Sequence, residues 1–331
     1  MSAEGNAGNV WNAGTLEWLP NGNYSNRSIP IVTSREPLWD QPNLAQDVEA
    51  GRYYLPNAPT GGRETIITHP VSAEPQWLMR MPMPGWPPLI AAWFTAAFFL
   101  LLTVKLVIPA FACGVVAIGG ILRWGWGLDP KPLDAPADIG GGLKLPTYMS
   151  GPKSQAWWAM VVLMLVSASI YGCVLFSYLY LWTVSPDIWP AEYPTLAQPL
   201  ACAALLALSS FAVGFANRSL KENRLGVMAA AMVAAVVLFS AGFGIMLQTH
   251  WALAPSESAY GAIVWLGVSL AGFYGFVAIA MALFALARWL KGMLDPVRRV
   301  TFDNARLFWH YTVAQTLVGL LLVHGFPRLI S

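Results

Sequence analysis

The stretch from Ala156 to Thr183 constrains the fold most strongly, because it holds no charged side chain. A helix of about 28 residues rises about 42 Å, which exceeds the ~30 Å hydrocarbon core of a bilayer and so requires a tilt. Small residues at its centre, among them Ser167, Ala168 and Gly172, predict close contact with neighbouring helices. The stretch therefore predicts a membrane-spanning helix.

The composition of the whole chain agrees with this reading. Of its 331 residues 56% are hydrophobic and 11% are charged, whereas soluble domains have about 25% charged residues. The net charge of +2 and the lack of a basic run argue against nucleic-acid binding. Cys113, Cys173 and Cys202 lie in apolar segments without Cys-x-x-Cys spacing, so we expect buried thiols, not disulfides or zinc ligands. No basic region precedes an apolar run at the start, so we expect no cleavable signal peptide.

We expect an all-α polytopic membrane protein with seven transmembrane helices, arranged as a two-helix hairpin plus a five-helix bundle. Residues 1–83 are polar and rich in Pro, Gly and Asn, which predicts an extended extramembrane arm with a short helix near Asn43 to Gly51. Hydrophobic residues recur along this arm, so we expect it to fold against a partner and not to be disordered. The hairpin is predicted at 84–128, a linker at 129–153, and the five-helix body at 154–331. The spans of the body are predicted at Ala156–Thr183, Leu196–Asn217, Leu225–Gln248, Tyr260–Trp289 and Ala305–Phe326.

The hairpin is predicted from the length of the apolar run between Leu89 and Trp124. One helix of about 36 residues would reach about 54 Å, too long for a bilayer even when tilted. The run must therefore fold back, and we place the turn near Lys105 to Pro109. Lys105 then reaches the interface from the turn. The alternative is that it serves a proton pathway inside the membrane.

The distribution of basic residues predicts the orientation. Alternate loops carry nearly all of them: Arg80, Arg123, Lys131, Lys144, Lys153, Arg218, Lys221, Arg224, Arg288, Lys291, Arg298, Arg299 and Arg306. The other loops hold Asp187, Glu192 and Glu257, and the only basic residues on that side are Lys105 and Arg328. By the positive-inside rule, the N-terminal arm is cytoplasmic and the C-terminus lies outside.

The sequence offers no convergent catalytic or metal-binding set. His310 and His324 are about 21 Å apart along one helix and cannot bind the same ion. We read them as hydrogen-bonding residues, with metal ligation as the alternative. No Asp or Glu stands near the centre of a predicted span, so no proton relay is visible. We therefore predict no catalytic, cofactor-binding or metal-binding residue in this chain.

Several local patterns occur from Trp157 onward. In the first pattern, small residues and then aromatic ones run from Ser167 to Tyr180, and Trp189-Pro190 follows. In the second, Gln248 is followed by Tyr260-Gly261. The third and fourth patterns are Gly272-Phe273-Tyr274-Gly275 and Phe308-Trp309-His310-Tyr311-Thr312-Val313. These patterns resemble subunit III of the aa3-type haem–copper cytochrome c oxidases. The chain departs from that family at Ala168, Tyr274 and Val313, where relatives carry an acid, a histidine and an aspartate. A role of the buried acid in proton uptake is therefore not expected here.

The front of the chain carries Thr15-Leu16-Glu17-Trp18, which is similar to the sequence that follows the catalytic helices of oxidase subunit I. The chain thus resembles the C-terminal part of a subunit I–III fusion: a subunit I tail, a two-helix extension and a five-helix subunit III body. The resemblance covers nearly the whole length.

The resemblance implies a non-catalytic structural subunit of a proton-pumping cytochrome c oxidase in the bacterial cytoplasmic membrane, with a cytoplasmic N-terminus and a periplasmic C-terminus. It implies subunits I and II as partners, haem a, haem a3 and copper in those partners, and contact with other respiratory complexes. It further implies phospholipid in a cleft between the hairpin and the other helices. Candidate lipid-binding residues are Arg224, Arg288, Lys291, Trp309 and His310. For the basic residues, simple anchoring at the interface is an equal alternative.

Three other functions remain as alternatives. The first is subunit III of a quinol oxidase, because the electron-donor site lies on other subunits. The second is an independent transporter, which predicts polar sites within the membrane. The third is a stand-alone haem protein, which predicts paired histidines on facing helices.

Overall fold

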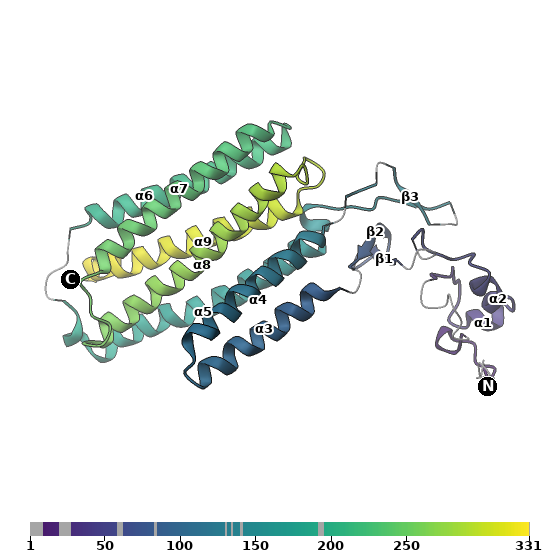
Figure 1. The fold of residues 1–331 in the computed structure, drawn as a ribbon, viewed down its shortest axis with the longest axis horizontal. Helices are drawn as coiled ribbons and strands as arrows, with labels where there is room; N and C mark the ends of the chain where they lie inside the picture. The colour runs from purple at the N-terminus through teal and green to yellow at the C-terminus, as the bar shows by residue number, and fades with distance from the viewer. Residues whose placement is uncertain are drawn as a thin grey trace. The chain divides into compact units, whose positions relative to one another are not determined.

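The computed structural model describes residues 9–19, 28–57, 62–82, 85–129, 131–133, 135–139, 142–190 and 195–330. The chain divides into two compact units, Met1–Tyr148 and Met149–Ser331 (Figure 1). The division falls inside the segment 129–153 that we predict as a linker. The α3–α4 hairpin thus belongs to the first unit and α5 to α10 to the second.

Seven helices in the described part of the chain are long and apolar enough to cross a membrane. They are α3 (Trp86–Thr103), α4 (Val107–Gly127), α5 (Gln155–Val184), α6 (Ala197–Lys221), α7 (Leu225–His250), α8 (Ala259–Leu290) and α9 (Val300–Leu320), the last continued by the π-helical turn η6 (Leu321–Gly325) and by α10 (Phe326–Ile330). A membrane interior leaves backbone groups no water to bond, which is why spanning segments adopt helices. The protein is an all-α polytopic membrane protein, as predicted.

The α3–α4 hairpin turns where the sequence indicates. Lys105 lies between the two helices with a φ of 63°, and its side chain is exposed. The predicted position of Lys105 at the turn is thus confirmed. Pro109 belongs to the first turn of α4, where a missing N–H costs no hydrogen bond. Small residues let the helices approach, since a Cβ on Gly120 would lie 3.2 Å from the backbone nitrogen of Ala91.

The N-terminal arm holds more structure than predicted. Its helical elements are η1 (Leu16–Trp18), α1 (Pro37–Asp40) and α2 (Leu44–Glu49), and α2 confirms the short helix predicted near Asn43 to Gly51. Strand β1 (Arg63–Thr68) pairs antiparallel with β2 (Pro75–Met81), with Arg63 opposite Met81 and a shift in register after Ile67. Residues 1–8, 20–27, 58–61 and 83 of the predicted arm lie outside the described residues.

A small apolar core corrects the prediction of a merely extended arm. Leu55 and Leu78 are buried together with Ala137 and Leu145. The last two belong to the short strands β3 (Ala137–Asp138) and β4 (Lys144–Leu145), which pair with each other. The predicted linker thus supplies part of the core under the β1–β2 hairpin. Sequence patterning misses this because neither β1 nor β2 alternates cleanly between apolar and polar residues.

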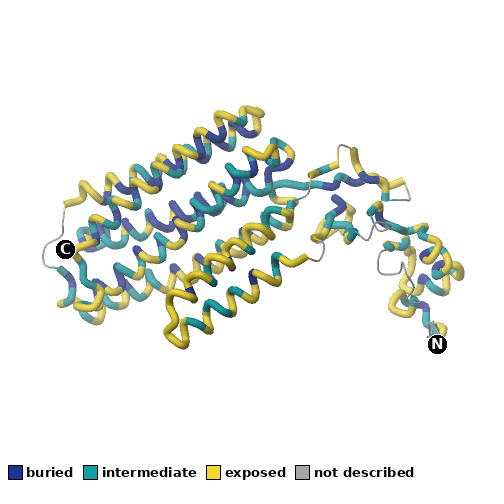
Figure 2. The backbone as a smooth tube through the Cα atoms, viewed as in Figure 1, coloured by how far each residue is buried: buried dark blue, intermediate teal, exposed yellow. Residues whose placement is uncertain are grey.

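The five-helix unit is organised around α9. This helix contacts α5, α6 and α8, while α7 contacts α6 and α8 (Figure 1). Buried residues are densest along α9 and sparse along α3 and α4 (Figure 2). At one end of the unit, Tyr178, Trp182 and Tyr260 pack around Trp189, with ring centroids 5.1–5.4 Å from the Trp189 ring. The aromatic end of α5 therefore packs into a cluster inside the protein.

Three local expectations are wrong. The last span begins at Val300 and not at Ala305, because the charges at its start neutralise one another (see below). In the small centre of α5, Ser167 is buried, but Ala168 and Gly172 are exposed, so only part of that centre packs within the five-helix unit. Among the cysteines, Cys202 is buried as expected, but Cys113 is half-buried and Cys173 is exposed.

Close packing of α7 on α8 leads to the first prediction. A Cβ added at Gly275 would lie 2.5 Å from Cε1 of Phe239, whose ring is buried and packs edge-on against Trp309. Because that ring has no free space to move into, Gly275→Ala should lower the unfolding free energy by about 1–3 kcal/mol. Unfolding in mixed micelles measures this change. Gly267→Ala on the same helix is the control, since its Cβ meets only ordinary contacts; equal losses in both variants would contradict the packing argument.

Candidate functional site

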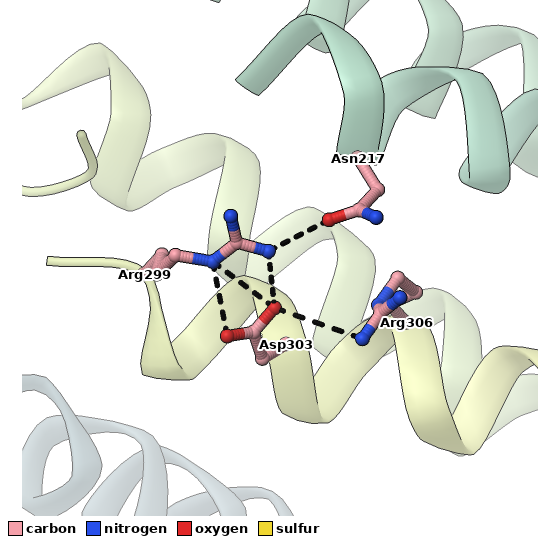
Figure 3. A network of polar contacts seen from close by, with 4 residues as sticks. All are labelled: Asn217, Arg299, Asp303 and Arg306. Atoms are coloured by element: carbon pink, nitrogen blue, oxygen red, sulfur yellow. Dashed lines mark hydrogen bonds and ion pairs between the residues drawn. The ribbon is translucent and has the colours of Figure 1, made fainter. Parts of the chain in front are cut away.

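The interface between α6 and α9 holds the main polar contacts between helices of the five-helix unit. We call the end of this unit that carries Arg218, Lys221, Arg298 and Arg299 the basic end. Four residues there form what we call the polar clasp: Asn217, Arg299, Asp303 and Arg306 (Figure 3). Arg299 precedes the first residue of α9, Asp303 lies in its first turn, and Asn217 lies near the end of α6.

The clasp is tight and largely enclosed. The Arg299 guanidinium donates to both carboxylate oxygens of Asp303, with Nε 3.0 Å from Oδ2 and Nη2 2.6 Å from Oδ1. Nη2 also donates to Oδ1 of Asn217 at 2.7 Å, which ties α9 to α6 (Figure 3). The Arg299 and Asp303 side chains are only 10% and 5% exposed. The carboxylate also lies at the positive end of the α9 dipole, which stabilises it further.

Two hydrogen bonds join the same helices farther along. The indole Nε1 of Trp309 donates to Oγ of Ser209 at 3.2 Å, and both side chains are fully buried. On the next residue of each helix, Oγ of Ser210 lies 2.6 Å from Nδ1 of His310. The clasp and these two bonds fix the distance and rotation of α9 against α6.

A groove of about 730 Å³ opens beside the Ser210–His310 pair. Apart from that pair and Arg218, its walls are apolar: Ala207, Phe211, Gly214, Phe215, Val313, Ala314 and Leu317. Arg218 lies about 12 Å along α6 from Ser210, at the basic end. Phe211 and Phe215 are largely exposed, so the groove opens on the surface of the unit. This arrangement suits an amphiphile with an anionic group at Arg218 and an apolar chain beside the phenyl rings.

The five predicted lipid-binding residues do not come together in one site. His310 lines the groove, and Arg224 and Lys291 are exposed at the basic end, where Arg224 pairs with Glu222. Arg288 and Trp309 are fully buried, so neither side chain lies on a surface of the five-helix unit. The prediction that Trp309 lines a cleft is therefore wrong for this unit; its indole instead joins α9 to α6.

Sequence reasoning missed Ser210 and Arg218 as parts of a site. The signal was available in the helical spacing of Ala207, Phe211, Gly214 and Arg218, which places small, aromatic and basic residues on one face of α6. It also missed the pairing of His250 with His324, whose Nε2 atoms lie 3.2 Å apart at the end opposite the basic end. Within the described ranges no three His, Cys, Asp or Glu residues group closely enough to hold a metal ion.

The fold and the site define a multi-pass membrane protein whose five-helix unit carries a groove with one basic end. Comparison with models of known protein families finds no match for the chain.

The clasp yields a test of stability. Asp303→Ala should lower the unfolding free energy by roughly 3–5 kcal/mol, because it leaves the enclosed Arg299 guanidinium without its counter-charge. Glu222→Ala removes the partner of Arg224 from an ion pair that is more than half exposed, so a loss below about 1 kcal/mol is expected. The unfolding free energies of both variants, measured in mixed micelles, test this difference. Similar losses of unfolding free energy in the two variants would mean that the clasp stabilises the fold no more than an exposed ion pair does.

Proposed function

We propose that this protein is a non-catalytic, subunit III-type membrane subunit of an aa3-type haem–copper cytochrome c oxidase. The observation that carries the proposal is the grouping of its spans: α3 and α4 lie in one compact unit and α5 to α9 in another. This is the two-plus-five grouping that the resemblance to subunit III implies. The sequence from Thr15 to Trp18 adds support, since a subunit I tail would precede the hairpin in a fused chain.

The proposed role is structural. The chain packs against subunit I, which carries the haems and copper together with subunit II, and stabilises it during turnover. The bacterial cytoplasmic membrane is the proposed location, with the N-terminus cytoplasmic by the positive-inside rule. The segregation of basic residues supports this orientation, because Arg218, Arg288 and Arg299 all lie at the basic end of the five-helix unit.

Phospholipid binding is the second part of the proposal. The α6–α9 groove supports it through the exposed Arg218 and through apolar walls that include Phe211 and Phe215. A cation near the interface attracts a lipid phosphate, worth about 1 kcal/mol per residue. The cleft between the hairpin and the remaining helices, which the resemblance implies, stays a separate prediction.

Co-purification tests the assembly. A tagged chain extracted in mild detergent should bring down larger subunits, show the visible spectrum of haem a, and contain copper in the complex. Oxygen consumption with reduced cytochrome c is the expected activity, whereas activity only with a quinol would favour the quinol oxidase alternative. Recovery of the chain alone as an active transporter, or haem held by the isolated chain, would overturn the proposal.

Filling the groove tests the lipid site. A Cβ at Gly214 meets no atom within 4 Å, so Gly214→Leu should fold and place its side chain in the groove. Phospholipid retained per chain should fall by about one molecule, as measured by lipid mass spectrometry of the purified protein. Gly244→Leu on α7 is the matched control, because its Cβ is equally free and lies outside the groove. Unchanged lipid in Gly214→Leu would refute the groove as the binding site.

A further inference from the structure

Two histidines meet at the end of the five-helix unit opposite the basic end. His250 is the last residue of α7, and His324 lies 74 positions later in the π-helical turn η6. Their side chains are almost fully enclosed, with residue exposures of 3% and 7%. The two Nε2 atoms are 3.2 Å apart and the rings are tilted by 50°. Neither residue belongs to the groove or to the clasp.

The hydrogen bonds of His250 fix which of its ring nitrogens is free. Nδ1 lies 2.8 Å from the carbonyl oxygen of Met246, and a carbonyl only accepts, so Nδ1 carries the proton. Nε2 therefore presents a lone pair toward His324. Metal-binding histidines are commonly held in this way, with one ring nitrogen donating to a backbone carbonyl and the other free to ligate.

The backbone around His324 adopts an unusual conformation, and this conformation places His324 against His250. Leu321 to Gly325 form a π-helical turn between α9 and α10. Such turns are rare, cost regular hydrogen bonding, and occur frequently at functional sites. The turn changes the rotation of the residues that follow α9, and His324 is the residue that it brings against His250. Packing alone does not call for an imidazole on each side of this contact.

The separation of the nitrogens suits one shared ion. If a metal ion lies about 2.0–2.1 Å from both nitrogens, which are 3.2 Å apart, the nitrogen–metal–nitrogen angle is about 100°, close to tetrahedral. Two axial ligands on opposite sides of a haem iron would need roughly 4 Å between nitrogens, with the macrocycle between the rings. The pair therefore fits a small ion and not a haem.

A small cavity lies beside His250, and a third donor lies on its wall. His250 and Met246 both line a cavity of about 40 Å³, which is enough for one water molecule. A water there would approach from the side of His250, and Tyr171, Tyr178 and Thr316 also line the cavity. The thioether of Met246 is a soft donor on the same wall, and soft donors select Cu(I). Arg328, which donates to the carbonyl oxygen of His324, repels a monovalent ion less than a divalent one.

We propose that His250 and His324 form a binding site for a single transition-metal ion, with Cu(I) favoured over Zn²⁺. Without metal, Nε2–H of His324 donates to Nε2 of His250. With metal, the proton of His324 resides on its Nδ1, and both imidazoles ligate as neutral groups. No proton is released by the pair and no electron is transferred. The site goes beyond the proposed function, which assigns metal only to partner subunits, and it does not depend on that function.

A metal titration of the full-length chain tests the site. The chain, carrying a tag without histidine, is stripped of metal in detergent and titrated with Cu(I) under ascorbate against a chromophoric chelator, and separately with Zn²⁺. We expect one Cu(I) per chain. His250→Gln and His324→Gln should each weaken binding at least about 10-fold. His69→Gln is the matched control, because His69 is exposed in the first unit and should leave the Cu(I) affinity unchanged.

X-ray absorption of the Cu(I)-loaded wild-type chain gives a readout that does not rely on the variants. Nitrogen scatterers at about 2 Å would support imidazole ligation. Size-exclusion profiles check that the glutamine variants remain folded. Tighter binding of Zn²⁺ than of Cu(I) would overturn the choice of ion while supporting the site. Less than a tenth of an equivalent of either metal on the wild type, or binding by both glutamine variants as tight as that of the wild type, would overturn the site itself.

Discussion

The carboxylate of Asp303 is the contact on which the arrangement of the five-helix unit most depends. It lies at the start of α9, and α9 is the helix that touches α5, α6 and α8. A carboxylate in this position is costly unless its charge is compensated, and the Arg299 guanidinium compensates it with bonds to both oxygens. The same guanidinium reaches Asn217, so one compensated charge also sets how α6 lies against α9. The groove beside Ser210 and His310 lies along the same contact between α6 and α9.

This interaction also explains how far the fold follows from the sequence. Four of the five spans of the second unit are predictable to within a few residues because long uncharged runs have no other stable form in a membrane. The start of α9 is not predictable in this way, because Arg299, Asp303 and Arg306 look like loop charges until their mutual contacts are known. The β1–β2 hairpin was not predicted, for a related reason. Its buried face is completed by Ala137 and Leu145, which follow the helices α3 and α4 in the sequence.

The candidate sites were less predictable, and the reason is pairing at long range. His310 was found because it belongs to a recognisable pattern in the last span. Its partner Ser210 lies 100 residues earlier, and His250 lies 74 residues before His324. Helical periodicity shows which face of a helix a residue occupies but not which other helix that face meets. Arg288 illustrates the opposite error, since a basic residue at a helix end predicts an exposed anchor and the structure buries it.

The distribution of polar groups along the five-helix unit bears on the departures from the subunit III pattern. Tyr274, in place of a histidine, packs against Phe308 and Tyr311, and Val313, in place of an aspartate, is buried. Between the clasp at one end and the histidine pair at the other, His310 is the one histidine in the described parts of α5 to α9. A single imidazole cannot relay protons across a span of this length. Among the described residues, the polar contacts between these helices therefore gather at the two ends and along the α6–α9 interface.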